Sequence, residues 1–113
     1  MYTCRHERRL LQVLQLARNH EHKKALVACR IYKGSRVVST GVNGRFNHAE
    51  RVAVSNASAW DLNGCIAYVA RSRKDGSQGL ARPCSNCHED LMLHNVTRVY
   101  YTTDNGYQME DWL

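Results

Sequence analysis

Residues 65–71 constrain the fold of this chain more than any other segment. They read Cys-Ile-Ala-Tyr-Val-Ala-Arg and are apolar along most of their length. Such a run is typical of a central strand in a sheet that is covered on both faces. The chain has 113 residues, which is enough for one modest core and leaves no room for a second module. We therefore expect one domain, residues 1–113, built around a sheet.

The remaining segments predict three helices and four further strands. The predicted helices cover residues 5–20, 48–60 (with Asn47 as N-cap) and 84–94 (opened by Pro83). The predicted strands cover residues 25–32, 36–40, 98–102 and 107–112, and residues 72–80 form a loop. The turn Asp104-Asn105-Gly106 predicts a hairpin, so that the last strand is antiparallel. The order α-β-β-α-β-α-β-β describes an α/β fold with a mixed five-stranded sheet.

The cysteines do not form a disulfide framework, because there are five of them and their spacing is irregular. Cys29 and Cys65 lie in apolar, strand-like segments, where a free cysteine acts as a small core residue. The N-terminal residues 1–9 are charged where a signal peptide has its apolar stretch, and no apolar run is long enough to cross a bilayer. We therefore expect a cytoplasmic protein with no membrane partner.

Two short motifs supply the chemistry. Asn47-His48-Ala49-Glu50 provides an imidazole and a carboxylate, and Pro83-Cys84-Ser85-Asn86-Cys87 provides two thiols. Each motif lies at a predicted helix start. In the second motif the two cysteines can face one point, and the helix dipole there favours thiolate over thiol. Two thiolates and one imidazole suit zinc, and three protein ligands with a fourth position open are typical of catalytic zinc. The spacing therefore predicts a catalytic zinc site.

Three other interpretations of the motifs compete with a catalytic site. A Cys-x-x-Cys redox pair would follow the first strand of its fold, whereas this pair comes late, and a structural zinc ribbon needs a second cysteine pair. A non-catalytic zinc domain that binds nucleic acid is a third possibility, but it would not need Glu50. Four other histidines compete as metal ligands: His20, His22, His88 and His94.

Glu50 has the position of a proton carrier. It lies two residues after His48, so on a regular helix the two side chains do not share a face. Glu50 is therefore better placed to contact a water molecule at the metal than to ligate the metal. Zinc makes water reactive near neutral pH, and a carboxyl group in apolar surroundings has a pKa suited to taking and returning a proton.

The two motifs resemble the signature of the zinc-dependent cytidine and deoxycytidylate deaminase superfamily. The likeness runs from about residue 25 to residue 103 and includes Val99-Tyr100-Tyr101. It implies a three-layer fold with helices on both faces of a mixed five-stranded sheet. Carried over onto this sequence, it implies zinc held by His48, Cys84 and Cys87, Glu50 as the catalytic proton shuttle, and substrate contacts from Asn43 and from the backbone amide of Ala49.

The implied activity is hydrolytic deamination of a cytosine nucleotide or nucleoside to its uracil form, with release of ammonia. The alternative is a cytosine or adenine deaminase that acts on single-stranded DNA or RNA. Histidine as the first ligand is shared with the deoxycytidylate, tRNA adenosine and polynucleotide deaminases. The short C-terminal hairpin instead resembles the branch acting on free nucleosides and nucleotides. The family generally assembles its pockets at subunit contacts, so the resemblance also implies a homo-oligomer.

The chain is basic, with a net charge of +6 and a pI near 9.3. Such a charge indicates a phosphorylated substrate or a polyanionic partner, and the alternative is that it only keeps the protein soluble. The basic residues that flank the predicted pocket loops are Arg45, Arg71, Arg73, Lys74 and Arg82. They are candidates for binding a 5′-phosphate or a nucleic-acid backbone. We expect Arg82, next to Pro83, and Arg45 to contact the substrate.

Overall fold

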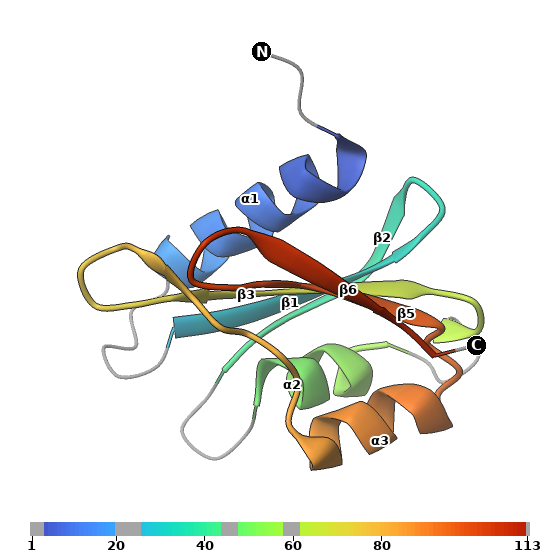
Figure 1. Ribbon diagram of the computed structural model, residues 1–113. Coiled ribbons are helices and arrows are strands. Elements are labelled where there is room, and N and C mark those ends of the chain that lie inside the picture. The colour runs from blue at the N-terminus through green and yellow to red at the C-terminus, as the bar shows by residue number, and fades with distance from the viewer. Residues whose placement is uncertain (1–3, 20–25, 44–47, 58–61, 113) are drawn as a thin grey trace.

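A twisted sheet lies between one helix on one face and two helices on the other (Figure 1). The structure is a computed structural model that describes residues 4–19, 26–43, 48–57 and 62–112. The helices are α1 (Arg5–Asn19), α2 (Ala49–Ser55) and α3 (Ser85–Leu93). The strands are β1 (Leu26–Lys33), β2 (Arg36–Val42), β3 (Ile66–Ser72), β4 (Gln78–Gly79), β5 (Arg98–Thr102) and β6 (Tyr107–Asp111). No described helix is both long enough and apolar enough to cross a membrane.

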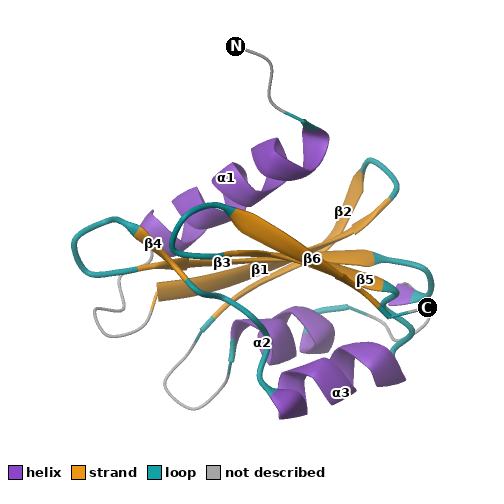
Figure 2. Ribbon diagram, viewed as in Figure 1, coloured by secondary structure: helices purple, strands orange, loops and turns teal. Residues whose placement is uncertain are grey.

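The sheet has the strand order β2-β1-β3-β5-β6, with the short β4 paired beside β3 (Figure 2). β1 is antiparallel to both β2 and β3, and β3 is parallel to β5. β6 returns antiparallel to β5 through a turn in which the Thr103 N–H donates to the Gly106 carbonyl at 2.9 Å. The predicted mixed sheet and its antiparallel last strand are confirmed, and β4 is an additional strand.

Both faces of β3 are buried, as its composition predicts. Tyr68 and Ala70 pack under α1, whereas Ala67 and Val69 pack under α2 and α3, and all four are 0% exposed. α1 covers its face with a row of buried residues at helical spacing: Leu10, Val13, Leu14 and Ala17. Burying apolar side chains on both sides of one sheet gives the three-layer arrangement.

The strand directions place the first turns of α2 and α3 at the same edge of the sheet. β2 and β3 both run antiparallel to β1, so they run in the same direction and end at the same edge. The chain leaves β2 toward α2, and it leaves β3 by way of β4 toward α3 (Figure 1). Residues at these two helix starts are therefore brought together although they lie far apart in the sequence.

Two local predictions are corrected. α2 begins at Ala49 with His48 as its N-cap and ends at Ser55, whereas the sequence predicts a helix over 48–60 capped by Asn47; position 47 and positions 58–60 lie outside the described residues. The predicted loop 72–80 contains β4. This two-residue strand is fixed by a tertiary contact, since the buried Thr102 hydroxyl donates to the Gly79 carbonyl at 2.7 Å.

Candidate active site

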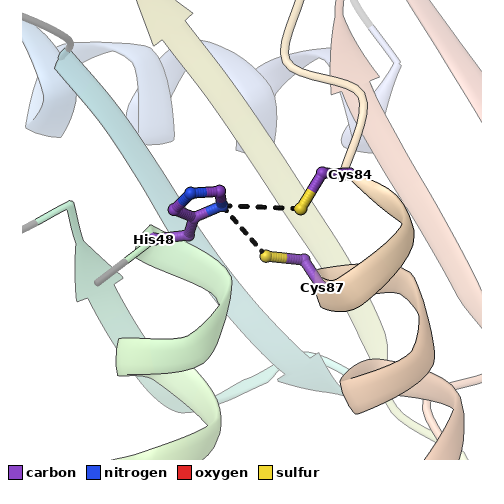
Figure 3. A group of neighbouring side chains, drawn as sticks. All are labelled: His48, Cys84 and Cys87. Carbon is purple, nitrogen blue, oxygen red and sulfur yellow. Dashed lines mark hydrogen bonds between the residues drawn. The ribbon is translucent and has the colours of Figure 1, made fainter. Parts of the chain in front are cut away.

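Three side chains with metal-binding atoms converge where α2 and α3 begin (Figure 3). The Nδ1 atom of His48 lies 3.6 Å from the Sγ atom of Cys84 and 3.3 Å from the Sγ atom of Cys87. All three ligand atoms lie within 4.8 Å of one another. Around a tetrahedral zinc ion with bonds of about 2.3 Å to sulfur and about 2.0 Å to nitrogen, such atoms are about 3.5 Å apart. The donor set and its spacing therefore fit zinc.

The backbone at the start of α3 leaves the Cys84 thiol available to a metal. Cys84 is the N-cap residue, its backbone is extended at φ −67° and ψ 167°, and its side chain makes no capping hydrogen bond. Cys87 lies in the first helical turn and is 1% exposed. The unpaired N–H groups and the positive end of the helix dipole at this position favour thiolate over thiol.

α2 lies directly against β2, and this contact positions His48 and Glu50. Gly41 on β2 faces the first two turns of the helix, and a Cβ atom there would lie 2.5 Å from the Ala49 carbonyl oxygen. The Ser39 hydroxyl on the same strand donates to the Ala53 carbonyl at 2.6 Å. Only glycine at position 41 allows this close approach.

The carboxyl group of Glu50 lies beside the three ligands in a buried setting. Glu50 is 5% exposed, and burial raises the pKa of its carboxyl group. Burial also raises the pKa of the Cys87 thiol well above its ordinary value, and the negative charge of Glu50 adds to the effect. A bound dication would reverse the balance at Cys87, because metal binding requires the thiolate and releases a proton.

One pocket of about 230 Å³ is lined by most of the predicted site residues, although Cys87 is not among its lining residues. Its lining includes Asn43, His48, Ala49, Glu50, Arg82 and Cys84. Arg45 lies outside the described residues. Four further residues line the pocket: Val27, Arg71, Leu80 and Ala81. No local pattern indicates Val27, Leu80 or Ala81 as site residues. Val27 reaches the pocket through its pairing with Arg71 across β1 and β3, and Leu80 and Ala81 follow β4, where the Ala81 N–H donates to the Thr102 carbonyl at 2.9 Å.

Two of the predicted substrate contacts already have partners within the chain. The Asn43 side-chain oxygen accepts the Val27 N–H at 2.9 Å, which leaves the amide NH2 group of Asn43 as a donor. The Arg82 guanidinium donates two hydrogen bonds to the Glu110 carboxylate, each at 2.9 Å. Asn43 thus lines the pocket with its side-chain oxygen engaged, whereas the charge of Arg82 is compensated.

The competing histidines do not join the three-ligand group among the described residues. The His88 ring stacks on Trp112 with ring centroids 4.2 Å apart, and His94 Nδ1 bonds the Asp90 carbonyl at 2.8 Å. His20 and His22 lie outside the described residues. A larger hollow of about 640 Å³ between α2 and α3 contains none of the three ligands; it is lined by Arg51, Val52, Val54, Ser55, Ala57, Asp90 and His94.

Comparison with solved structures identifies RibD from Acinetobacter baumannii as a protein of the same fold. Its form 1 superposes with a TM-score of 0.69 at 23% identity, and its form 2 with a TM-score of 0.66 at 21% identity. Each match covers 87% of this chain but only 28% of RibD, and at this identity the likeness shows the fold alone. No curated protein sequence matches the chain. Residues 4–103 match the cytidine and deoxycytidylate deaminase zinc-binding region, and the chain therefore belongs to this zinc-dependent deaminase family.

Proposed function

We propose that this protein is a zinc-dependent hydrolase that deaminates a cytosine nucleotide or nucleoside to its uracil form and releases ammonia. The observation that carries the proposal is the placement of Glu50. A buried carboxyl group with a raised pKa shares one pocket with His48 and Cys84 of the three-ligand group. A purely structural zinc site needs no such group, whereas hydrolysis needs a proton carrier.

In the proposed mechanism His48, Cys84 and Cys87 hold zinc, which supplies Lewis acidity that makes a water molecule reactive near neutral pH. Glu50 accepts a proton from the attacking water and passes it to the ring nitrogen of the base. It then takes the second proton from the same oxygen and delivers it to the amino group, which leaves as ammonia while that oxygen remains as the new carbonyl. Its raised pKa suits a group that must both take and return protons.

The base is held by backbone and amide groups at the pocket wall. The N–H of Ala49 is at the first position of α2, where an N–H group has no partner within the helix. We propose that it donates to the base edge. Asn43, whose oxygen is engaged by Val27, donates through its NH2 group to the base or the sugar. These two donors would orient the amino group toward Glu50.

The proposal is tested by incubating the zinc-loaded protein with cytidine, deoxycytidine, their 5′-monophosphates, adenosine and a cytosine-containing single-stranded oligonucleotide. Released ammonia and base conversion are measured. Turnover of a cytosine monomer supports the proposal. Conversion found only within the oligonucleotide supports the alternative, a polynucleotide deaminase, which the net charge of +6 also favours. No conversion of any substrate contradicts both.

Replacing Glu50 by alanine separates catalysis from zinc binding. We expect Glu50→Ala to keep the fold and the bound zinc but to lose ammonia release by about 100-fold or more, because it removes the proton carrier. Zinc content, circular dichroism and initial rates are compared with those of Glu89→Ala, which removes an exposed carboxylate from α3. Activity close to wild type in Glu50→Ala would exclude the mechanism.

A further inference from the structure

Among the described residues, Arg71 differs from Arg73 and Arg82 in having no acidic partner. Arg82 is paired with Glu110, and Arg73 is paired with Asp104. Among the residues that the structure describes, no carboxylate forms an ion pair with Arg71. Arg71 is also exposed and lines the same pocket as Glu50. Its charge is therefore available to a ligand, whereas the charges of the other two are compensated.

The register of the sheet directs Arg71 toward the pocket. Side chains alternate along a strand, so Arg71 shares a face of β3 with Val69, which packs in the core under α2 and α3. Arg71 is paired across the sheet with Val27, another residue of the pocket lining. Gly79 on β4 leaves room for the Arg71 side chain, whose Cδ atom lies 3.4 Å from the place that a Cβ atom would take.

The backbone that carries Arg71 is fixed by a buried hydroxyl group. The Arg71 N–H donates to the Thr102 hydroxyl oxygen at 3.1 Å, and that hydroxyl donates to the Gly79 carbonyl at 2.7 Å. Thr102 is 3% exposed, so both hydrogen bonds are shielded from water. One side chain of β5 thus ties β3 to β4, and Arg71 projects from a rigid strand rather than from a loop.

We infer that Arg71 binds the phosphate group of the substrate, and that the substrate is a cytosine 5′-monophosphate rather than a nucleoside. The inference rests on the proposed function, which places the amino group of the base at Glu50. A nucleotide carries its phosphate at the end away from that amino group, and guanidinium binds phosphate through paired N–H donors. A nucleic-acid strand is bound through several phosphates and needs several uncompensated cations. Arg73 and Arg82 are engaged with carboxylates, which favours a single terminal phosphate.

The test compares kcat/KM for cytidine and deoxycytidine with kcat/KM for their 5′-monophosphates in the wild type, Arg71→Gln and Arg73→Gln. We expect the wild type to prefer the monophosphates. Arg71→Gln should lose about 10- to 100-fold on the monophosphates and little on the nucleosides, because it removes charged hydrogen bonds to phosphate only. Inorganic phosphate should compete with the monophosphate in the wild type and much less in Arg71→Gln. Arg73→Gln, which removes an exposed and already paired arginine, should keep the wild-type preference.

The possible outcomes distinguish this inference from the proposed function. If the wild type turns over neither nucleosides nor monophosphates, the proposed function fails and the inference with it. If nucleosides are deaminated but Arg71→Gln keeps the wild-type preference, only the inference fails. An equal loss on both substrate classes would assign Arg71 a structural role and overturn the inference. Turnover confined to an oligonucleotide, falling steeply as salt rises, would overturn it in favour of a strand-binding site.

Discussion

His6 on α1 belongs to a hydrogen-bonded chain of three side chains over the sheet. Its Nδ1 atom lies 2.6 Å from the Tyr68 hydroxyl oxygen, which also accepts an N–H of Arg9 at 3.0 Å. Arginine can only donate, so the hydroxyl hydrogen of Tyr68 is free to be donated to Nδ1 of His6 when that atom carries no proton. The His6 ring is also stacked on Tyr100 with centroids 4.1 Å apart. Partial burial in this setting favours the neutral form of His6.

We expect His6 to make the fold less stable in weak acid. Burial lowers the pKa of His6 below its ordinary value of 6.5, and the charges of Arg5, Arg9 and Arg98 lower it further. The unfolded chain therefore binds a proton first, so stability is lost as the pH falls through 6.5 toward the folded pKa. The free energy of unfolding in urea should decline less between about pH 7.5 and about pH 5.5 in His6→Gln than in the wild type. The same decline in both proteins would contradict the assignment.

Sequence spacing predicted which residues meet at the site, but not which charged residues there form ion pairs with other parts of the chain. His48, Glu50, Cys84 and Cys87 come together because each motif begins a helix, and a helix start can be read locally. The ion pair of Arg82 joins two residues 28 positions apart, and no local pattern indicates it. The sequence therefore could not show that the charge of Arg82 is paired with that of Glu110.

At the scale of elements, the packing of α2 on β2 determines where His48 and Glu50 lie. We expect Gly41→Ala to destabilise the protein by about 1–3 kcal/mol and to weaken zinc binding, because the added methyl group meets the helix backbone and displaces α2. Unfolding of the metal-free protein and zinc competition with a chelator measure the two effects. Gly106→Ala is the matched control, since a Cβ atom there meets nothing within 4 Å. Unchanged zinc affinity in Gly41→Ala would show that α2 does not depend on this contact.

The elements themselves were largely predictable, and the exceptions depend on contacts between distant segments. Apolar spacing and turn residues predicted α1, α3 and the five main strands to within a few residues. β4 was missed because Gln78 and Gly79 have no strand-like composition, and their pairing depends on Thr102 across the sheet. The position of β1 between β2 and β3 was likewise not predicted, because the strand order follows from packing of the whole chain.

At the scale of the whole molecule, the site lies between the starts of α2 and α3, two helices that also contact each other and are joined by the Arg51–Asp90 ion pair. α2 packs against β1 and β2, whereas α3 lies between β4 and β5 in the chain and contacts α2 (Figure 1). His48 belongs to the start of α2, and Cys84 and Cys87 to the start of α3. A metal bound by all three would therefore join the segment between β2 and β3 to the segment between β4 and β5. Its binding energy would add to the stability of the fold.

Removing zinc should therefore lower the stability of the entire domain. When free zinc exceeds its Kd about a thousandfold, binding adds about 4 kcal/mol, which for a domain of this size raises Tm by more than about 10 °C. We expect a strong chelator to abolish this rise in the wild type, measured by thermal unfolding. Cys87→Ser and His48→Ala should unfold at the lower temperature with or without zinc, because each removes a ligand.

Cys4→Ser, which changes an exposed thiol on the N-terminal side of α1, should respond to zinc as the wild type does. A full zinc-dependent rise of Tm in Cys87→Ser would show that the metal binds elsewhere. Loss of the zinc-dependent rise of Tm in Cys4→Ser would show that the three-ligand group is incomplete.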